Sequence, residues 1–155
     1  MLGGRERDQY PGAFWEQQRI LSGEGKAMRI LVAEDDPLVL LSAAEHLRDE
    51  GFEVIEAPTG EQALALFPRN LPIHVLLTDI RMPGRVDGWE LARRIRDQDP
   101  DVAVIYVTGY SDLPASPVSG SLFFNKPYRM ERIVEAIHAL HEHPKISAGS
   151  PRGAD

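Results

Sequence analysis

Cysteine is absent from this chain of 155 residues, which excludes a disulfide framework, a thiol nucleophile and a zinc–thiolate site. Basic residues are outnumbered by acidic ones, 17 to 24, and no cluster of lysine and arginine offsets the net charge of −7. We therefore expect no direct binding to nucleic acid or to an anionic membrane surface. The acidic balance fits a site that gathers carboxylates around a divalent cation.

Long apolar runs are missing as well. No stretch approaches 18 apolar residues and the N-terminus has no signal-peptide core, so we expect a cytoplasmic protein without a membrane span. The length suits one domain, which we place at residues 28–143. Glycine and proline interrupt residues 1–27, where we predict a flexible extension, and the Gly/Pro/Ser-rich residues 144–155 predict a disordered tail. Because that tail is short, we expect no output domain.

Short apolar runs alternate with amphipathic segments along the folded part. Runs bounded by turn signals predict buried strands at 29–33, 53–57, 73–77, 102–107 and 122–125. Apolar residues at helical spacing predict helices from Pro37 to about Gly51, at 61–67, at 89–96 and up to about His141. Two prolines in 111–120 leave a fourth helix shortened or absent. The alternation indicates an α/β fold, a flavodoxin-like doubly wound sheet of five parallel strands in the order 2-1-3-4-5.

Polar residues follow four of these predicted strands. In chain order they are Glu34-Asp35-Asp36, Asp79, Thr108 and Lys126. Strands 1, 3, 4 and 5 of this sheet order end around one crevice, which brings an acidic cluster, a hydroxyl and an ammonium together. Taken alone, a strand-end aspartate such as Asp79 usually caps a turn, and Asp36 before Pro37 indicates a helix N-cap. Convergence of the four strand ends favours a functional site.

The same residues carry a family resemblance. Glu34-Asp35, the run from Thr78 to Gly84 (Thr-Asp-Ile-Arg-Met-Pro-Gly), Thr108-Gly109 and Lys126-Pro127, in this order, resemble the receiver domain of two-component response regulators. The resemblance spans about residues 28 to 141. It implies that a histidine kinase or histidine phosphotransfer protein transfers a phosphoryl group to Asp79, and that the phosphorylated form signals to another protein. Such a domain is no classical enzyme, because it catalyses only its own phosphorylation and dephosphorylation.

The resemblance also assigns a metal site. A divalent cation, Mg²⁺ or Mn²⁺, removes the repulsion between a carboxylate nucleophile and a phosphoryl group. By resemblance, Asp35 and Asp79 bind the cation directly, Glu34 acts through water, and the backbone carbonyl of Arg81 completes the set. Magnesium takes few protein carboxylates and keeps several waters, which agrees with such a set.

Further roles follow from the same comparison. Lys126 supplies a charge and Thr108 a hydroxyl to the phosphoryl group. Thr108 is also the switch contact, together with Phe123 at the position of the family's switch aromatic. We further hypothesise that Arg81 and Tyr110, each two positions beyond a site residue, hinder an attacking water and set the rate of hydrolysis.

The chain departs from the usual receiver pattern at three places. Glu34 stands where many receivers have aspartate. The loop 83–88 is one residue longer than usual, and the segment between Thr108 and Lys126 is about one helical turn shorter. A shortened fourth helix after Thr108-Gly109-Tyr110 resembles an atypical receiver subgroup with a Thr-Gly-Tyr-like motif.

Other readings stay open at this point. We expect the chain to act as a stand-alone receiver. It would either bind a kinase or another regulator, or drain phosphate from a phosphorelay. The sequence does not determine whether it forms a homodimer. One alternative is a receiver-like module that binds partners without phosphorylation. A haloacid-dehalogenase-like phosphatase would need a second aspartate where Arg81 stands, and a flavodoxin-like nucleotide binder would need an anion-binding loop where Glu34-Asp35-Asp36-Pro37 stands.

Overall fold

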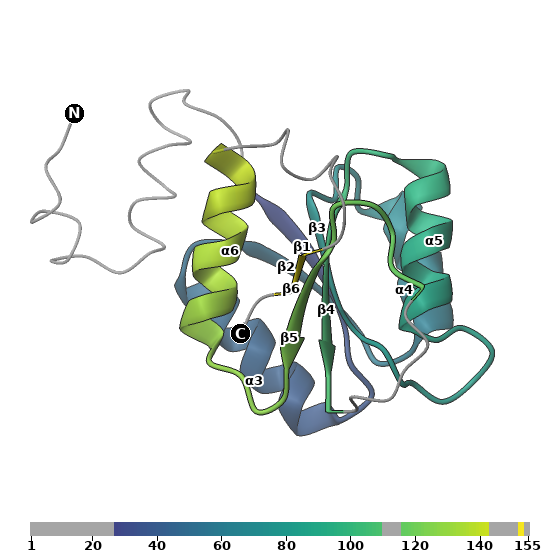
Figure 1. Cartoon of the computed structure of the whole chain (residues 1–155), viewed down its shortest axis with the longest axis horizontal. Helices are drawn as coiled ribbons and strands as arrows, with labels where there is room; N and C mark the ends of the chain where they lie inside the picture. The colour runs from purple at the N-terminus through teal and green to yellow at the C-terminus, as the bar shows by residue number, and fades with distance from the viewer. Residues whose placement is uncertain (1–26, 110–115, 143–151, 154–155) are drawn as a thin grey trace, which may run out of the picture.

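The computed structural model describes residues 27–109, 116–142 and 152–153, and it forms a parallel sheet with helices on both faces (Figure 1). Most of the predicted N-terminal extension and tail, as well as Tyr110, lie outside the described residues. In chain order the elements are β1 (Arg29–Ala33), α3 (Pro37–Asp49), β2 (Glu53–Ala57), α4 (Gly60–Leu66), the 3₁₀ turn η1 (Phe67–Arg69), β3 (Val75–Asp79), α5 (Gly88–Gln98), β4 (Ala103–Thr108), β5 (Leu122–Asn125), α6 (Met130–Glu142) and β6 (Arg152–Gly153).

The sheet has the predicted topology with one addition. Its strand order is β2-β1-β3-β4-β5-β6, and every neighbouring pair is parallel. The five-stranded order 2-1-3-4-5 is therefore confirmed. A sixth strand of two residues, β6, pairs with the outer edge of β5 at Leu122↔Arg152 and Phe123↔Gly153. It falls within the segment for which the sequence predicts a disordered tail.

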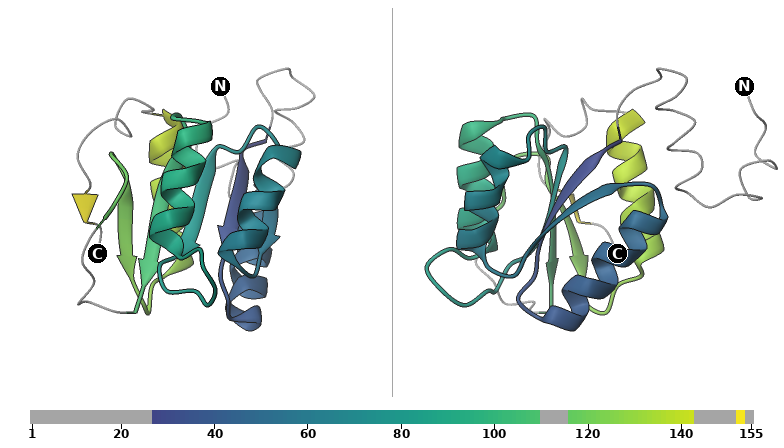
Figure 2. Two further views of the ribbon diagram at one scale, coloured as in Figure 1. Left: turned by 90° about the vertical axis from the view of Figure 1, so that its right-hand side faces the viewer. Right: turned by 180° about the vertical axis from the view of Figure 1, so that it is seen from behind.

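Two helical layers cover the sheet. Helices α3 and α6 lie on one face, and α4 and α5 on the other (Figure 1; Figure 2, right). Side chains of each strand alternate between the layers, so Ile30 packs with α3 and α6 while Leu31 packs with α4 and α5. Burial on both faces explains why the strands are continuous apolar runs. Of the described helices, none has the length and apolar character that crossing a bilayer requires.

Side-chain caps fix where three helices begin. Asp36 accepts a hydrogen bond from the Leu38 N–H at 3.0 Å and caps α3, as the sequence predicts. Thr59 accepts from the Gln62 N–H to cap α4, and Asp87 does the same for α5. Each such cap contributes about 1 kcal/mol. They therefore set the position at which each loop at the carboxyl end of the sheet enters its helix.

The loop after β3 is clamped to the start of α4. One carboxylate oxygen of Glu61 accepts hydrogen bonds from the N–H groups of Arg85 (2.7 Å) and Val86 (3.0 Å). Gly84, with a φ of 102°, provides the left-handed turn that brings these N–H groups round to Glu61. A Cβ at Gly60 would collide with the Val86 carbonyl oxygen. The unusual length of this loop is thus accommodated by one glycine turn and one carboxylate.

No helix lies between β4 and β5 in the described residues, in agreement with a shortened or absent fourth helix. Residues 116–121 instead form a strap, and two hydrogen bonds from or to side chains of the sheet and α5 hold it. The Tyr106 hydroxyl accepts from the Val118 N–H at 3.2 Å, and Arg96 Nη1 donates to the Ser119 carbonyl at 2.8 Å. Beneath the strap, the Tyr106 ring stacks on Phe123, with ring centroids 5.0 Å apart. The Val118 N–H and the Ser119 carbonyl, which a helix would satisfy internally, are therefore satisfied here by side chains.

Candidate functional site

Three carboxylates meet at the carboxyl ends of β1 and β3. Glu34 and Asp35 follow β1, and Asp79 is the last residue of the neighbouring β3. One oxygen from each lies within 4.8 Å of the others. Glu34 and Asp79 are only 3% and 7% exposed, whereas Asp35 is exposed to solvent. The site therefore consists of a buried acidic floor with one carboxylate open to solvent.

Lys126 bridges the two buried acids. Its Nζ donates to Asp79 Oδ2 at 2.9 Å and to Glu34 Oε2 at 3.2 Å. The Lys126–Pro127 peptide is cis. The lysine's backbone N–H donates to the Thr108 carbonyl at 2.8 Å, which ties the loop after β5 to the end of β4. Residues from four strand ends thus come together as the strand order predicts.

The electrostatics of the bridge favour a charged lysine. Partial burial disfavours the ammonium, but its hydrogen bond and attraction to Asp79, and then to Glu34, outweigh that effect and raise the pKa of Lys126. Burial, followed by the negative charge of Asp79, raises the pKa of Glu34 against the opposing influence of the Asp36 N–H and Lys126. The Lys126 ammonium is therefore the group that balances two crowded carboxylates.

The remaining predicted site residues lie at different depths. Thr108 is buried at the end of β4, one register position beyond the Asp79↔Val107 pair. Phe123 lies on β5, half-buried, in the aromatic cluster with Tyr106 and Trp89, away from the carboxylates. Arg81 is exposed in the loop after β3. Tyr110 lies outside the described residues.

Gly88 was not among the predicted site residues, yet it sets how closely the loop after β3 returns to Asp79. A Cβ at Gly88 would collide with the backbone carbonyl of Asp79, so the first residue of α5 must be glycine for the loop to return this closely. Burial, and to a smaller extent the charge of Glu34, raise the pKa of the Tyr128 phenol.

Comparison with known proteins decides the family. A family model described as the response regulator receiver domain matches residues 30–138. The chain belongs to the receiver domain family of two-component response regulators. It is therefore a signal-transduction domain related to chemotaxis-type receivers, and the haloacid-dehalogenase-like and flavodoxin-like readings are set aside.

Named relatives agree with this assignment. The chain is 33% identical over 116 residues to the response regulator receiver protein CpdR of Brucella abortus, covering 72% of this chain and 95% of CpdR. It spans about half the length of several other curated relatives that it matches. A crystal structure of a receiver protein from Sinorhizobium medicae is 30% identical with a TM-score of 0.71, over 76% of this chain and 97% of that one.

One solved relative bears on the metal. The response regulator TrrA of Thermotoga maritima, described in complex with Mg²⁺–BeF, is 31% identical with a TM-score of 0.63, over 73% of this receiver and 98% of TrrA. In this receiver, Glu34, Asp35 and Asp79 offer hard oxygen ligands, which Mg²⁺ prefers. One oxygen from each carboxylate lies within 4.8 Å of the others, slightly more than the separation of about 4 Å between opposite ligands of an octahedral Mg²⁺. The donor set thus suits a magnesium ion.

Proposed function

We propose that this receiver accepts a phosphoryl group on Asp79 from the phosphohistidine of a kinase or a histidine phosphotransfer protein. The observation that carries the proposal is the position of Asp79, 7% exposed at the end of β3, with Lys126 at 2.9 Å and two further carboxylates beside it. An aspartate that only caps a turn does not require a lysine and two further carboxylates beside it. We also propose that this receiver acts in the cytoplasm, as expected from the sequence.

The transfer is an in-line displacement at phosphorus. An Asp79 carboxylate oxygen forms the new O–P bond as the N–P bond of the donor breaks, and the histidine leaves with that electron pair. Glu34, Asp35 and Asp79 would hold a Mg²⁺ ion, which neutralises charge on the phosphoryl oxygens when bound. Lys126, already at Asp79, would remain to pair with a phosphoryl oxygen, and the Thr108 hydroxyl would donate to another.

We propose that the donor docks over the start of α3. Leu38 is 77% exposed and Leu41 is 47% exposed, and Leu38 lies in the first turn after the acidic residues. A donor that brings a phosphohistidine to Asp79 must cover this rim, where the two leucines would be buried. Downstream, the phosphorylated form would act on a partner protein or drain phosphate from a relay.

Hydrolysis of the aspartyl phosphate would be set in part by Arg81 and Tyr110, as hypothesised from the sequence. Arg81 is exposed in the loop that follows Asp79. Its side chain is long enough to obstruct a water approaching the phosphoryl group. An unchanged half-life of the phosphorylated form in either Arg81→Ala or Tyr110→Ala would remove this role.

The decisive experiment records intact mass after incubation with Mg²⁺ and a small acyl phosphate. Wild type should gain one phosphoryl group, and Asp79→Asn should gain none. Asp87→Asn is a matched control, because it removes a carboxylate that caps α5 and leaves Asp79 in place. If wild type gains no phosphoryl group while it binds Mg²⁺, the proposal fails and a phosphorylation-independent binding module becomes the better description.

A further inference from the structure

The outer edge of β5 is covered by the chain's own C-terminal residues. Strand β6 pairs there in parallel, through Arg152 and Gly153, and closes an edge that is otherwise open to strand addition (Figure 2, left). A two-residue strand is far below the usual strand length and cannot hold itself by pairing alone. Something beyond Gly153 must therefore contribute if this segment stays on the sheet.

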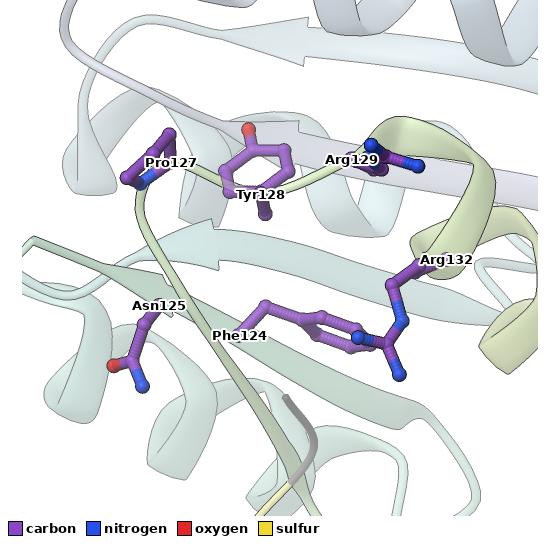
Figure 3. A pocket seen from close by; sticks show the side chains of 6 residues that line it. All are labelled: Phe124, Asn125, Pro127, Tyr128, Arg129 and Arg132. Carbon is purple, nitrogen blue, oxygen red and sulfur yellow. The ribbon is translucent and has the colours of Figure 1, made fainter.

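A pocket lies where the pairing ends. The next two residues of β5, Phe124 and Asn125, line a cavity of about 230 Å³ together with Pro127, Tyr128, Arg129 and Arg132 (Figure 3). Because β6 runs parallel to β5, a segment that continues past Gly153 in the same direction heads for this pocket. The edge and the pocket thus form one continuous surface.

The charge of the pocket specifies what it would hold. Arg129 and Arg132 both border it, and Figure 3 shows the Arg132 side chain extending from α6 to the Phe124 ring. The ion pairs among the described residues involve Arg29, Arg48, Arg93, Arg94 and Lys126, and neither pocket arginine. Among the described residues these two guanidiniums have no carboxylate partner, and guanidinium groups bind carboxylates through paired hydrogen bonds.

The sequence supplies such a carboxylate two residues after Gly153, at Asp155. We propose that the β5 edge and this pocket form a docking site for the chain's own C-terminal segment, in which Arg129 and Arg132 hold the carboxylate of Asp155. The inference does not depend on phosphorylation of Asp79. The site lies on the strand that carries Phe123, so an extended partner that adds to this edge must first displace the segment.

Backbone ¹⁵N relaxation of the full chain tests the proposal. The amides of Gly153 and Asp155 should show order parameters near those of rigid backbone, about 0.85, and should fall below about 0.6 in the double variant Arg129→Gln/Arg132→Gln. The matched control is Arg93→Gln/Arg94→Gln, which removes the same charge from exposed positions of α5, on the other face of the sheet. It should leave the C-terminal order parameters unchanged. Amide shifts of β1 and β3 report whether each variant keeps the fold.

A charge exchange makes the test specific. Asp155→Lys should lower the same order parameters, and combining it with Arg129→Glu/Arg132→Glu should restore them. Low order parameters in wild type, or values that do not change in the glutamine double variant, would overturn the proposal. Order that rises with protein concentration would also overturn it, because the occupant would then be a second copy of the chain.

Discussion

Replacing Lys126 with methionine should reveal how much the free energy of unfolding depends on the ammonium group between the buried carboxylates of Glu34 and Asp79. Methionine keeps most of the side-chain length and removes the charge, leaving Glu34 and Asp79 buried side by side without the bridge. Hydrogen bonds to charged groups contribute about 1.5–3 kcal/mol each, and exposed ion pairs about 0.2–1 kcal/mol. The side chain of Lys126 is 30% exposed and the side chains of Glu34 and Asp79 are 4% and 9% exposed, so an intermediate value applies. We expect a loss of about 2–3 kcal/mol in the free energy of unfolding at pH 7.5.

The loss should depend on pH in a defined direction. Glu34 has a pKa above its ordinary value in the folded protein, so the folded state binds more protons and stability falls as pH rises through that pKa. Without Lys126 the pKa of Glu34 should rise further, which widens the pH range over which the stability of the folded state falls. At pH 4, where Glu34 is largely protonated, the cost of Lys126→Met should therefore shrink.

Urea unfolding followed by circular dichroism at pH 4 and pH 7.5 measures both quantities. A second variant, Glu34→Gln, removes the repulsion between the carboxylates of Glu34 and Asp79. In that background, Lys126→Met should lower the free energy of unfolding by less at pH 7.5. An equal loss at both pH values, or the same cost with and without Glu34→Gln, would refute the reasoning that two crowded carboxylates are the source of the instability.

Three further outcomes are expected. Gly88→Ala should unfold the protein or abolish phosphorylation by a small acyl phosphate, because its Cβ collides with the Asp79 carbonyl, whereas Ala139→Gly at an exposed site of α6 should only lower the melting temperature slightly. Leu38→Asp should slow transfer from a histidine phosphodonor at least tenfold and leave labelling by the acyl phosphate unchanged; equal slowing with both donors would contradict docking over α3. Chelation of Mg²⁺ should abolish labelling of Asp79, and Asp35→Asn should raise the Mg²⁺ concentration needed for half-maximal labelling at least tenfold; labelling that persists with chelator would exclude a metal requirement.

The sequence predicted the sheet and the convergence of its strand ends because both follow from local patterns. Apolar runs such as Val75–Leu77 stop at a polar residue, and parallel connections leave little freedom in strand order. Boundaries shifted by one or two residues: β3 begins at Val75, and β4 includes Thr108. A shortened or absent fourth helix could be predicted from two prolines and from a segment about one helical turn shorter than usual.

Other features depend on contacts between distant residues and had no local signal. Glu61 binds N–H groups 24 and 25 positions away, and nothing in its surroundings distinguishes it from other exposed glutamates. The Tyr106 hydroxyl bonds the Val118 N–H, although the tyrosine sits in an apolar run that predicts plain core. Strand β6 is too short to produce an alternating pattern. Each is decided by tertiary packing, which outweighs local propensity.

The strap between β4 and β5 has a consequence for how readily this receiver can change its surface. A packed amphipathic helix would be released only by exposing several apolar side chains, at about 1.5–3 kcal/mol each. In the strap, Val118 alone is among the hydrophobic side chains described as packed against the core, and the hydrogen bonds with Tyr106 and Arg96 add together about 2–4 kcal/mol. Two states separated by a few kcal/mol leave roughly 0.1–10% of molecules in the minor form before any signal arrives. A modest bias from Thr108, at the end of the strand that carries Tyr106, would then be enough to shift that population.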